Sequence, residues 1–337
     1  MIISVNLFNY NQNGFKINKS PVFFGANLVS PKEVQNFIRL ISKQKLQENM
    51  LVLTSPETQG RAIGTQGIEI ASQFIEAQFE KIGLEPFCQI GLKTFSQPFL
   101  AYQPKLLFEE NLKNIYGWIR HKSNPPEIPA KNIVGIIRGK NPEKYLMLTA
   151  HYDHLGSIPE KNLIFPGAND NASGVSVLLE LARIFKKIKQ PEKSIIFAAL
   201  SDEEGYKKGA QTLAQSLIDN EIHSIDIINM DMLGGQKGNT IDLWQENKKL
   251  SVNIVGAFKQ TCDTLGLKLR LHRGDPCSDA TMFNIEGMPV VCASWDFLSK
   301  VNTRFFHTNA DTVDKINPEI LEKAAKAIGT ASLNLIC

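Results

Sequence analysis

Downstream of Lys131 the chain alternates short apolar runs with longer amphipathic stretches, and this alternation constrains the possible folds more than any other feature. The apolar runs predict strands at Asn132–Ile137, Tyr145–Ala150, Ser194–Leu200, Ile225–Met230, Thr240–Leu243 and Pro289–Ala293. The amphipathic stretches predict helices at Ala172–Ile188, Ala210–Ile218, Val252–Leu265 and Pro318–Ile336. Apolar strands separated by helices form a mainly parallel sheet that helices cover on both faces. The sequence therefore predicts a three-layer α/β fold with a mainly parallel central sheet flanked by helices.

The region before this alternation predicts helices joined by a turn. A helix is expected over Pro31–Gln47, where Ser30 suits the N-cap and a proline occupies the first turn. The stretch Gly60–Thr65 is rich in turn residues. A second helix is expected over Ile68–Ile82, closed by Gly83.

Length and composition suit one large domain. The chain has 337 residues, 43% of them hydrophobic, which is ample for a sizeable core. Residues 1–30 are irregular in pattern. We expect residues 31–337 to form a single domain in which residues 31–130 pack on a core of residues 131–337.

Charge and hydropathy exclude two classes of partner. The formal net charge is +3, and the lysines and arginines are scattered, so no basic stripe for nucleic acid is present. The longest apolar runs are too short to span a bilayer. The segment Met1–Ser20 lacks the order of a signal peptide, so we expect a cytoplasmic chain as written, or a periplasmic or secreted one if the natural N-terminus differs. The oligomeric state is left open.

The cysteines are not arranged as a structural framework. They are five in number, without a CxxC pair, at Cys88, Cys262, Cys277, Cys292 and Cys337. This pattern is not typical of a disulfide scaffold or a zinc–thiolate site, although one bridge, such as Cys277–Cys292, is compatible with it.

Five polar clusters follow predicted strands or precede helices. They are His151-Tyr152-Asp153-His154, Gly167 to Gly174 around Asp170, Ser201-Asp202-Glu203-Glu204-Gly205, Asp231, and His307 to Thr312. In parallel α/β sheets, ligands bind beyond the carboxyl ends of the strands, where most of these clusters fall. The sequence therefore predicts one site built from all five.

The residue types in these clusters suit zinc. Imidazoles and carboxylates are ligands that Zn²⁺ accepts, and three protein ligands leave a position for water. His151 and Asp153 point the same way if the segment is extended, so Asp153 can hold the far N–H of the imidazole. Glu203 and Glu204 point apart, so that one can coordinate while the other acts as a base.

Each cluster also has a purely structural explanation. A single His-x-Asp is usually a surface or capping pair, and Asp170-Asn171 is a good cap for the helix that follows. Glu203-Glu204-Gly205 is compatible with a solvated turn, and His307 with an exposed loop. The occurrence of all five in this order favours the site.

The clusters resemble the signature of the dizinc exopeptidase family that includes bacterial leucyl aminopeptidases, aminopeptidase Y and glutamate carboxypeptidases. The resemblance runs from about Gly60 to the C-terminus. It is strongest in Ala150-His151-Tyr152-Asp153-His154-Leu155-Gly156, in Gly167–Gly174, in Phe197–Gly209 and in Asn229-Met230-Asp231-Met232, with His307 and Asp311-Thr312 as the last block.

The resemblance implies a role for each matching residue. His151 and Asp231 would bind one Zn²⁺, Glu204 and His307 the other, and Asp170 would bridge the two, with Co²⁺ or Mn²⁺ as substitutes. Asp153 would orient His151, and Glu203 would be the general base and then the acid. The family also implies a cis peptide bond at Asp170-Asn171. The expected substrate is a peptide, cleaved at its N-terminal bond.

Two positions depart from the family pattern. Ala280 stands where the family often has a histidine, which removes a contact near the metals or the substrate. Asp275 stands where some aminopeptidases have a tyrosine, so stabilisation of the oxyanion would fall mainly to zinc. For the side-chain pocket we expect Met232, Trp295, Phe297 and Phe306, although each aromatic also suits ordinary core packing.

Three other functions are compatible with the same scaffold. A carboxypeptidase or dipeptidase would need a cation for the substrate carboxylate, and Arg304 or Arg273 is available for this. A glutaminyl cyclase relative would use a single zinc, which the full ligand set argues against. A non-catalytic binding module should lack ligands, and none is missing.

Overall fold

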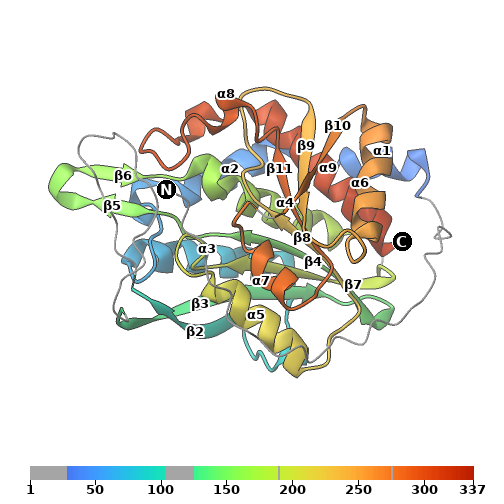
Figure 1. Cartoon of the computed structure of the whole chain (residues 1–337), viewed down its shortest axis with the longest axis horizontal. Coiled ribbons are helices and arrows are strands. Elements are labelled where there is room, and N and C mark those ends of the chain that lie inside the picture. The colour runs from blue at the N-terminus through green and yellow to red at the C-terminus, as the bar shows by residue number, and fades with distance from the viewer. Residues whose placement is uncertain (1–28, 104–124, 189, 275) are drawn as a thin grey trace.

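Nine strands pair into one sheet in the computed structural model, which describes residues 29–103, 125–188, 190–274 and 276–337 (Figure 1). Across the sheet the order is β1 (Glu85–Pro86), β3 (Glu127–Ile137), β7 (Lys193–Leu200), β4 (Asn141–His151), β8 (Ile225–Met230), β11 (Val290–Trp295), β9 (Thr240–Gln245) and β10 (Lys268–Arg273), and β2 (Ser96–Tyr102) pairs with β3.

Parallel pairing holds through the centre of the sheet. Strand β4 runs parallel to both β7 and β8, and β8 runs parallel to β11. Antiparallel pairs flank this centre, where β3 meets β7 and β9 meets β11. The predicted α/β class is confirmed, and the parallel centre places the carboxyl ends of four strands at one edge.

Helices cover both faces of the sheet. The helices α3 (Gln66–Ile82), α4 (Ser173–Phe185), α6 (Val252–Leu265) and α9 (Pro318–Ile336) lie on one face, and α5 (Lys208–Asp219) and α7 (Ala280–Ile285) lie in front of the other in Figure 1. Side chains alternate along β4 between the two cores: Leu146 and Leu148 join the first, whereas Tyr145 and Met147 join the second. This period of two is that of a strand buried on both faces.

The helix predicted over Pro31–Gln47 is wrong, because the structure has two helices there. Helix α1 covers Pro31–Ile38 and α2 covers Lys43–Leu53. Ser42 starts the second helix: its hydroxyl accepts from Lys45 N at 3.3 Å, and its own N–H donates to Glu180 Oε1, in α4, at 2.6 Å. A tertiary contact thus selects the break that the apolar periodicity does not show.

The remaining elements are short. They include the 3-10 helices Pro56–Thr58, Cys88–Ile90, Pro159–Lys161 and Val313–Lys315, the hairpin of β5 (Gly156–Ile158) and β6 (Leu163–Phe165), the π-type turn η5 (Ala168–Ala172) and α8 (Lys300–Thr303). Residues 1–28, which contain most of the predicted irregular N-terminal segment, and Asp275 lie outside the described residues.

The bridge left open between Cys277 and Cys292 is not formed. Cys277 is exposed, and Cys292 is buried in β11, where Asn229 Nδ2 donates to its sulphur at 3.7 Å. Among the helices of the described ranges, none is both long and apolar enough to cross a bilayer.

Candidate metal centre

The five predicted ligands converge beyond the carboxyl ends of the central strands. His151 is the last residue of β4, Asp231 directly follows β8, and Glu204 lies in the turn after β7. Asp170 sits in η5, just before α4, and His307 comes from the loop after α8. The fold thus brings together side chains from positions 151 to 307, as the strand-end argument predicts.

The first donor group surrounds the imidazole of His151. Its Nε2 lies 3.2 Å from Asp170 Oδ1 and 3.6 Å from Asp231 Oδ1. This nitrogen is buried and makes no hydrogen bond to any of the described residues. A nitrogen and two carboxylate oxygens therefore face one point without protein donors between them.

The second donor group surrounds Glu204. His307 Nε2 lies 3.1 Å from Glu204 Oε2 and 3.2 Å from Asp170 Oδ2. The two oxygens of Asp170 thus turn to different groups, Oδ1 to the first and Oδ2 to the second. One further histidine joins here, since His154 Nδ1 lies 2.7 Å from Glu204 Oε1 and 3.8 Å from Asp170 Oδ2. His154 had no predicted role, although it belongs to the polar cluster that follows the buried strand β4.

Backbone contacts hold Asp170 in place. The Asp170–Asn171 peptide bond is cis, which confirms the expectation from the family resemblance. The carboxylate of Asp311 accepts from Asn169 N at 2.9 and 3.1 Å and from Asp170 N at 3.1 Å. Asp311 therefore fixes the backbone that carries Asp170, a role that its position in the last sequence block did not reveal.

A buried arginine ties this backbone to the end of β4. Arg61 is fully buried, and its guanidinium donates to the carbonyls of Tyr152 (2.8 Å), Leu53 (2.6 Å), Pro166 (2.6 Å) and Gly167 (3.0 Å). Burial lowers the pKa of Arg61 to about 10, against the raising effect of Asp170. Arg61 was read from the sequence only as part of a turn, because nothing local shows which carbonyls it will meet.

Asp153 contacts both His151 and the glutamate turn. His151 Nδ1 lies 3.2 Å from the main-chain carbonyl of Asp153 and 3.7 Å from its carboxylate. The two carboxylate oxygens accept from Glu203 N and Glu204 N, each at 3.3 Å. Asp153 is thus placed to set the orientation of the imidazole and of the turn that carries both glutamates.

Glu203 and Glu204 point to different surroundings, as adjacent residues at a strand end should. Burial raises the pKa of Glu203 well above its usual range, while Lys207 acts in the opposite direction. The Nζ of Lys207 lies 3.1 Å from Glu203 Oε1 and donates to the Glu203 carbonyl at 3.0 Å. For Glu204, burial is outweighed by His307 and His154, and its pKa falls to about 2.

The electrostatics of the two groups fit divalent cations. Burial opposes the charged form of His307, but Glu204 and Asp170 outweigh it and raise its pKa to about 11. The pKa of His151 is likewise raised, against burial, by Asp153, Asp170 and Asp231. The carboxylates therefore favour a positive charge next to both imidazoles. A metal ion bound to each neutral imidazole would provide this charge. The residues present fit a pair of zinc ions.

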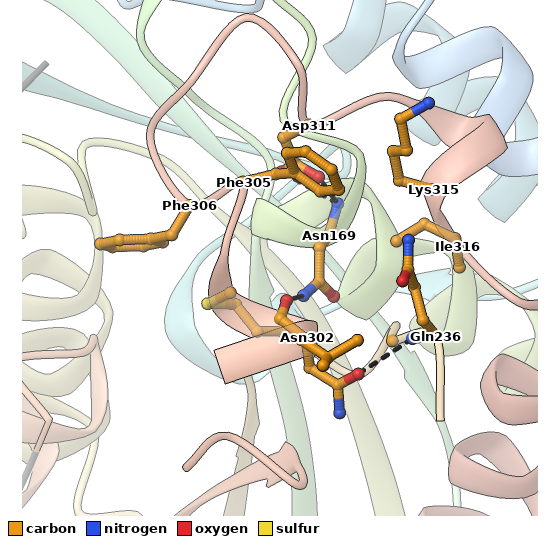
Figure 2. Close-up of a pocket in the computed structure, with 11 residues that line it drawn as sticks. Asn169, Gln236, Asn302, Phe305, Phe306, Asp311, Lys315 and Ile316 are labelled. Carbon is orange, nitrogen blue, oxygen red and sulfur yellow. Dashed lines mark hydrogen bonds between the residues drawn. The ribbon is translucent and has the colours of Figure 1, made fainter. Parts of the chain in front are cut away.

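A cavity adjoins the centre on the side of Asn169, the neighbour of Asp170 (Figure 2). Of the expected pocket residues, Met232 and Phe306 line it, together with Asn302, Phe305, Gln236 and Ile316 among others. Trp295 is instead buried, with its Nε1 donating to Lys237 O at 3.3 Å, and Phe297 packs edge-on against Trp244. The structure thus brings only two of the four expected residues to this cavity.

Ala280, where the sequence departs from the family pattern, is buried in the apolar core. Ala280 begins α7 and is buried in the same apolar cluster as Phe283. The adjacent Asp279 is fully buried, and its carboxylate has no hydrogen-bond partner among the described residues. Burial raises the pKa of Asp279 to about 8.

Sequence comparisons relate this chain to known peptidases. The family model of peptidase family M28 matches residues 132–332. Aminopeptidase YwaD of Bacillus subtilis is 30% identical over 208 residues, which are 60% of this chain and 44% of that protein. The chain spans less than half the length of the curated relatives it matches, between 24% and 44%.

Solved structures share the fold at lower identity. The aminopeptidase from Aneurinibacillus sp. strain AM-1 superposes with a TM-score of 0.69 at 16% identity, over 89% of this chain and 95% of that one. The glutaminyl cyclase of Porphyromonas gingivalis superposes with a TM-score of 0.62 at 18% identity, over 86% of this chain and 96% of that one. At these identities the likeness concerns the fold, so the chemistry must be argued from the side chains.

Proposed function

We propose that this chain, which belongs to peptidase family M28, is a zinc-dependent aminopeptidase that hydrolyses the N-terminal bond of peptides. The observation that carries the proposal is the position of Asp170, whose two oxygens face separate histidine–carboxylate groups. A carboxylate shared between two donor sets suits a pair of metal ions, and aminopeptidases are among the enzymes that use such pairs.

Five side chains would hold the metals. His151 and Asp231 belong to the first position, Glu204 and His307 to the second, and Asp170 to both. When bound, zinc supplies Lewis-acid chemistry, because it lowers the pKa of water towards neutrality and polarises the scissile carbonyl. Asp153 is the positioning residue for His151, and Co²⁺ or Mn²⁺ are the expected substitutes.

Glu203 is the proposed general base. Its carboxyl is buried, and its raised pKa brings it closer to the pH at which a base works best. It takes a proton from the attacking water and then gives that proton to the leaving amine. Asp275, which lies outside the described residues, stands where some aminopeptidases have a tyrosine, so stabilisation of the oxyanion would fall mainly to zinc.

Two aminopeptidases support the preference for a free N-terminus: YwaD, which is related in sequence, and the Aneurinibacillus enzyme, which shares the fold. The carboxypeptidase alternative depends on Arg304 or Arg273. The guanidinium of Arg304 stacks on Phe305 at 4.6 Å, and Arg273 ends β10 at the edge of the sheet. The cyclase alternative is kept because a cyclase shares the fold.

A substrate panel tests the proposal. We expect the purified protein to hydrolyse amino-acid p-nitroanilides, to leave N-blocked dipeptides intact, and to lose activity with a strong chelator until zinc or cobalt is restored. Cleavage of N-blocked dipeptides would establish the carboxypeptidase alternative, and cyclisation of N-terminal glutamine would establish the cyclase. Peptidase activity that is indifferent to chelators would exclude the metal mechanism altogether.

A further inference from the structure

His154 is built into the second donor group more firmly than a packing residue needs to be. Its side chain is completely buried. A methyl group on Gly167 would lie 2.4 Å from His154 Cδ2 and 2.5 Å from Cγ, so only glycine leaves room for the ring there. The ring also meets that of His307 edge-on, with their centroids 5.9 Å apart.

His154, Asp170 and Glu204 offer donor atoms that all lie within 4.8 Å of one another, close enough to share one metal ion. Donors about 2.0–2.1 Å from a tetrahedral zinc lie about 3.3 Å from one another. His154 Nδ1 is 2.7 Å from Glu204 Oε1, which is hydrogen-bond distance, and 3.8 Å from Asp170 Oδ2. The predicted ligand His307 lies 3.1 and 3.2 Å from the same two carboxylates. Both imidazoles therefore face the same pair of carboxylates.

A simpler role is that of a hydrogen-bonding neighbour of Glu204. A buried histidine normally pairs its second ring nitrogen in either role, as a neighbour or as a ligand. His154 Nε2 is buried without a hydrogen-bond partner in the part of the chain that the structure describes. The contacts of His154 are thus concentrated on the nitrogen that faces the carboxylates.

We infer that His154 is a fourth protein donor to the second metal position, through Nδ1. This inference rests on the proposed function only in needing metal at the centre. The second position then has four protein donors, His154, His307, Asp170 and Glu204, whereas the first has three, His151, Asp170 and Asp231. Four protein ligands close a zinc site, and three leave it open, so the second metal is held more tightly and the first takes water and substrate.

Replacement by asparagine separates the two roles. The amide nitrogen of His154→Asn can still donate to Glu204 from the place of Nδ1, but it cannot replace an imidazole ligand. We expect zinc at the second position to bind more weakly by more than the roughly 10–100-fold that loss of a supporting hydrogen bond costs. The visible spectrum of the cobalt-loaded protein should change, as with His307→Asn. The matched control is His272→Asn, which alters a histidine bonded to Asp242 on the edge strand β10 and should change neither measurement. Unchanged affinity and spectrum in folded His154→Asn would overturn the inference.

A measurement on the wild-type protein covers the case in which the variant fails to fold. In the cobalt-loaded protein, each coordinating histidine contributes one strongly shifted, exchangeable ring N–H proton resonance. Three such resonances support His154 as a ligand, and two, from His151 and His307, overturn it. A wild-type protein that shows three resonances but cleaves no peptide would remove the proposed function and leave this inference standing. A wild-type protein that binds no metal would remove both.

Discussion

Glu203 and Glu204 are neighbours in the chain, yet their surroundings differ, and we propose different tasks for them. Glu203→Gln keeps the size of the side chain but cannot accept a proton. We expect this variant to retain both zinc ions while kcat falls by roughly 10²–10⁴, the usual cost of losing a general base. Glu204→Gln should instead weaken metal at the second position. Zinc content and kcat measured on both variants decide the matter, and loss of metal from Glu203→Gln with a loaded, inert Glu204→Gln would reverse the roles.

Lys207 is the cation that faces Glu203 Oε1, at 3.1 Å. Its charge lowers the pKa of Glu203, against the larger effect of burial, so removing it lets that pKa rise. A base works only when deprotonated, and we therefore expect the acidic limb of the kcat/KM profile to move to higher pH in Lys207→Met. At slightly acidic pH, kcat/KM should fall by roughly tenfold, or about 1.4 kcal/mol in the barrier.

The next residue provides the control for this change. Lys208→Met removes a lysine whose Nζ contacts Gln211 Oε1 at 3.2 Å rather than Glu203. Its pH profile should match that of the wild type. Coincident acidic limbs in Lys207→Met and Lys208→Met would show that Lys207 does not act on the base.

At the scale of elements, the end of β4 and the turn η5 depend on Arg61. Its guanidinium pairs four carbonyls from three segments of the chain, and an uncharged replacement would leave these carbonyls without their donor. We expect Arg61→Met to lower the free energy of unfolding by at least about 3 kcal/mol. Urea denaturation measures this, with Arg138→Met as the control, because Arg138 forms an exposed pair with Glu85 that is worth at most about 1 kcal/mol. Equal losses in the two variants would contradict the role of Arg61.

Elements with strong local signals were predicted well. The bounds of β8, α6 and α9 are those expected from apolar runs and helical periodicity. Strand β10 was missed because the strands were predicted from apolar runs, whereas its sequence, KLRLHR, alternates polar and apolar residues as a half-exposed edge strand does. The break between α1 and α2 was missed because Glu180, remote in sequence, selects it.

The site shows the same division between local and tertiary information. The donors at strand ends were predicted, since the topology of a parallel sheet brings those ends together. Arg61, Asp311 and His154 were missed or left without a role. Their functions depend on which backbone groups and carboxylates approach them in the folded protein. Residue spacing along the sequence does not indicate these tertiary contacts.

On the scale of the whole molecule, the stability of the metal-free protein should fall as pH rises through neutrality. Asp279 has a pKa of about 8 in the fold against an ordinary value of 3.8, so its contribution to stability is lost as pH rises through that interval. His307 has a pKa of about 11 against 6.5, and the stability that its proton provides is complete below 6.5 and is lost above it. Both groups act in the same direction.

Zinc should reverse this trend. Metal binding needs neutral imidazole and strengthens as pH rises, so the gap in Tm between zinc-loaded and chelated protein should widen from about pH 6 to about pH 8.5. At 100 times its dissociation constant, one bound zinc adds about 2.7 kcal/mol to the free energy of unfolding. Thermal unfolding at the two pH values checks this, and a gap that narrows would show that protons and metal do not compete at this centre.

The wide spacing of the donors along the chain has a kinetic consequence. The segments that carry His151, Asp170, Glu204, Asp231 and His307 become neighbours only when β4, β7 and β8 are paired and the loop after α8 is in place. A folding transition state that lacks this last loop cannot yet hold both metals. Interactions absent from the transition state slow unfolding without accelerating folding. Zinc should therefore lengthen the lifetime of the folded protein, while the rate at which the chain folds stays close to that of the metal-free protein.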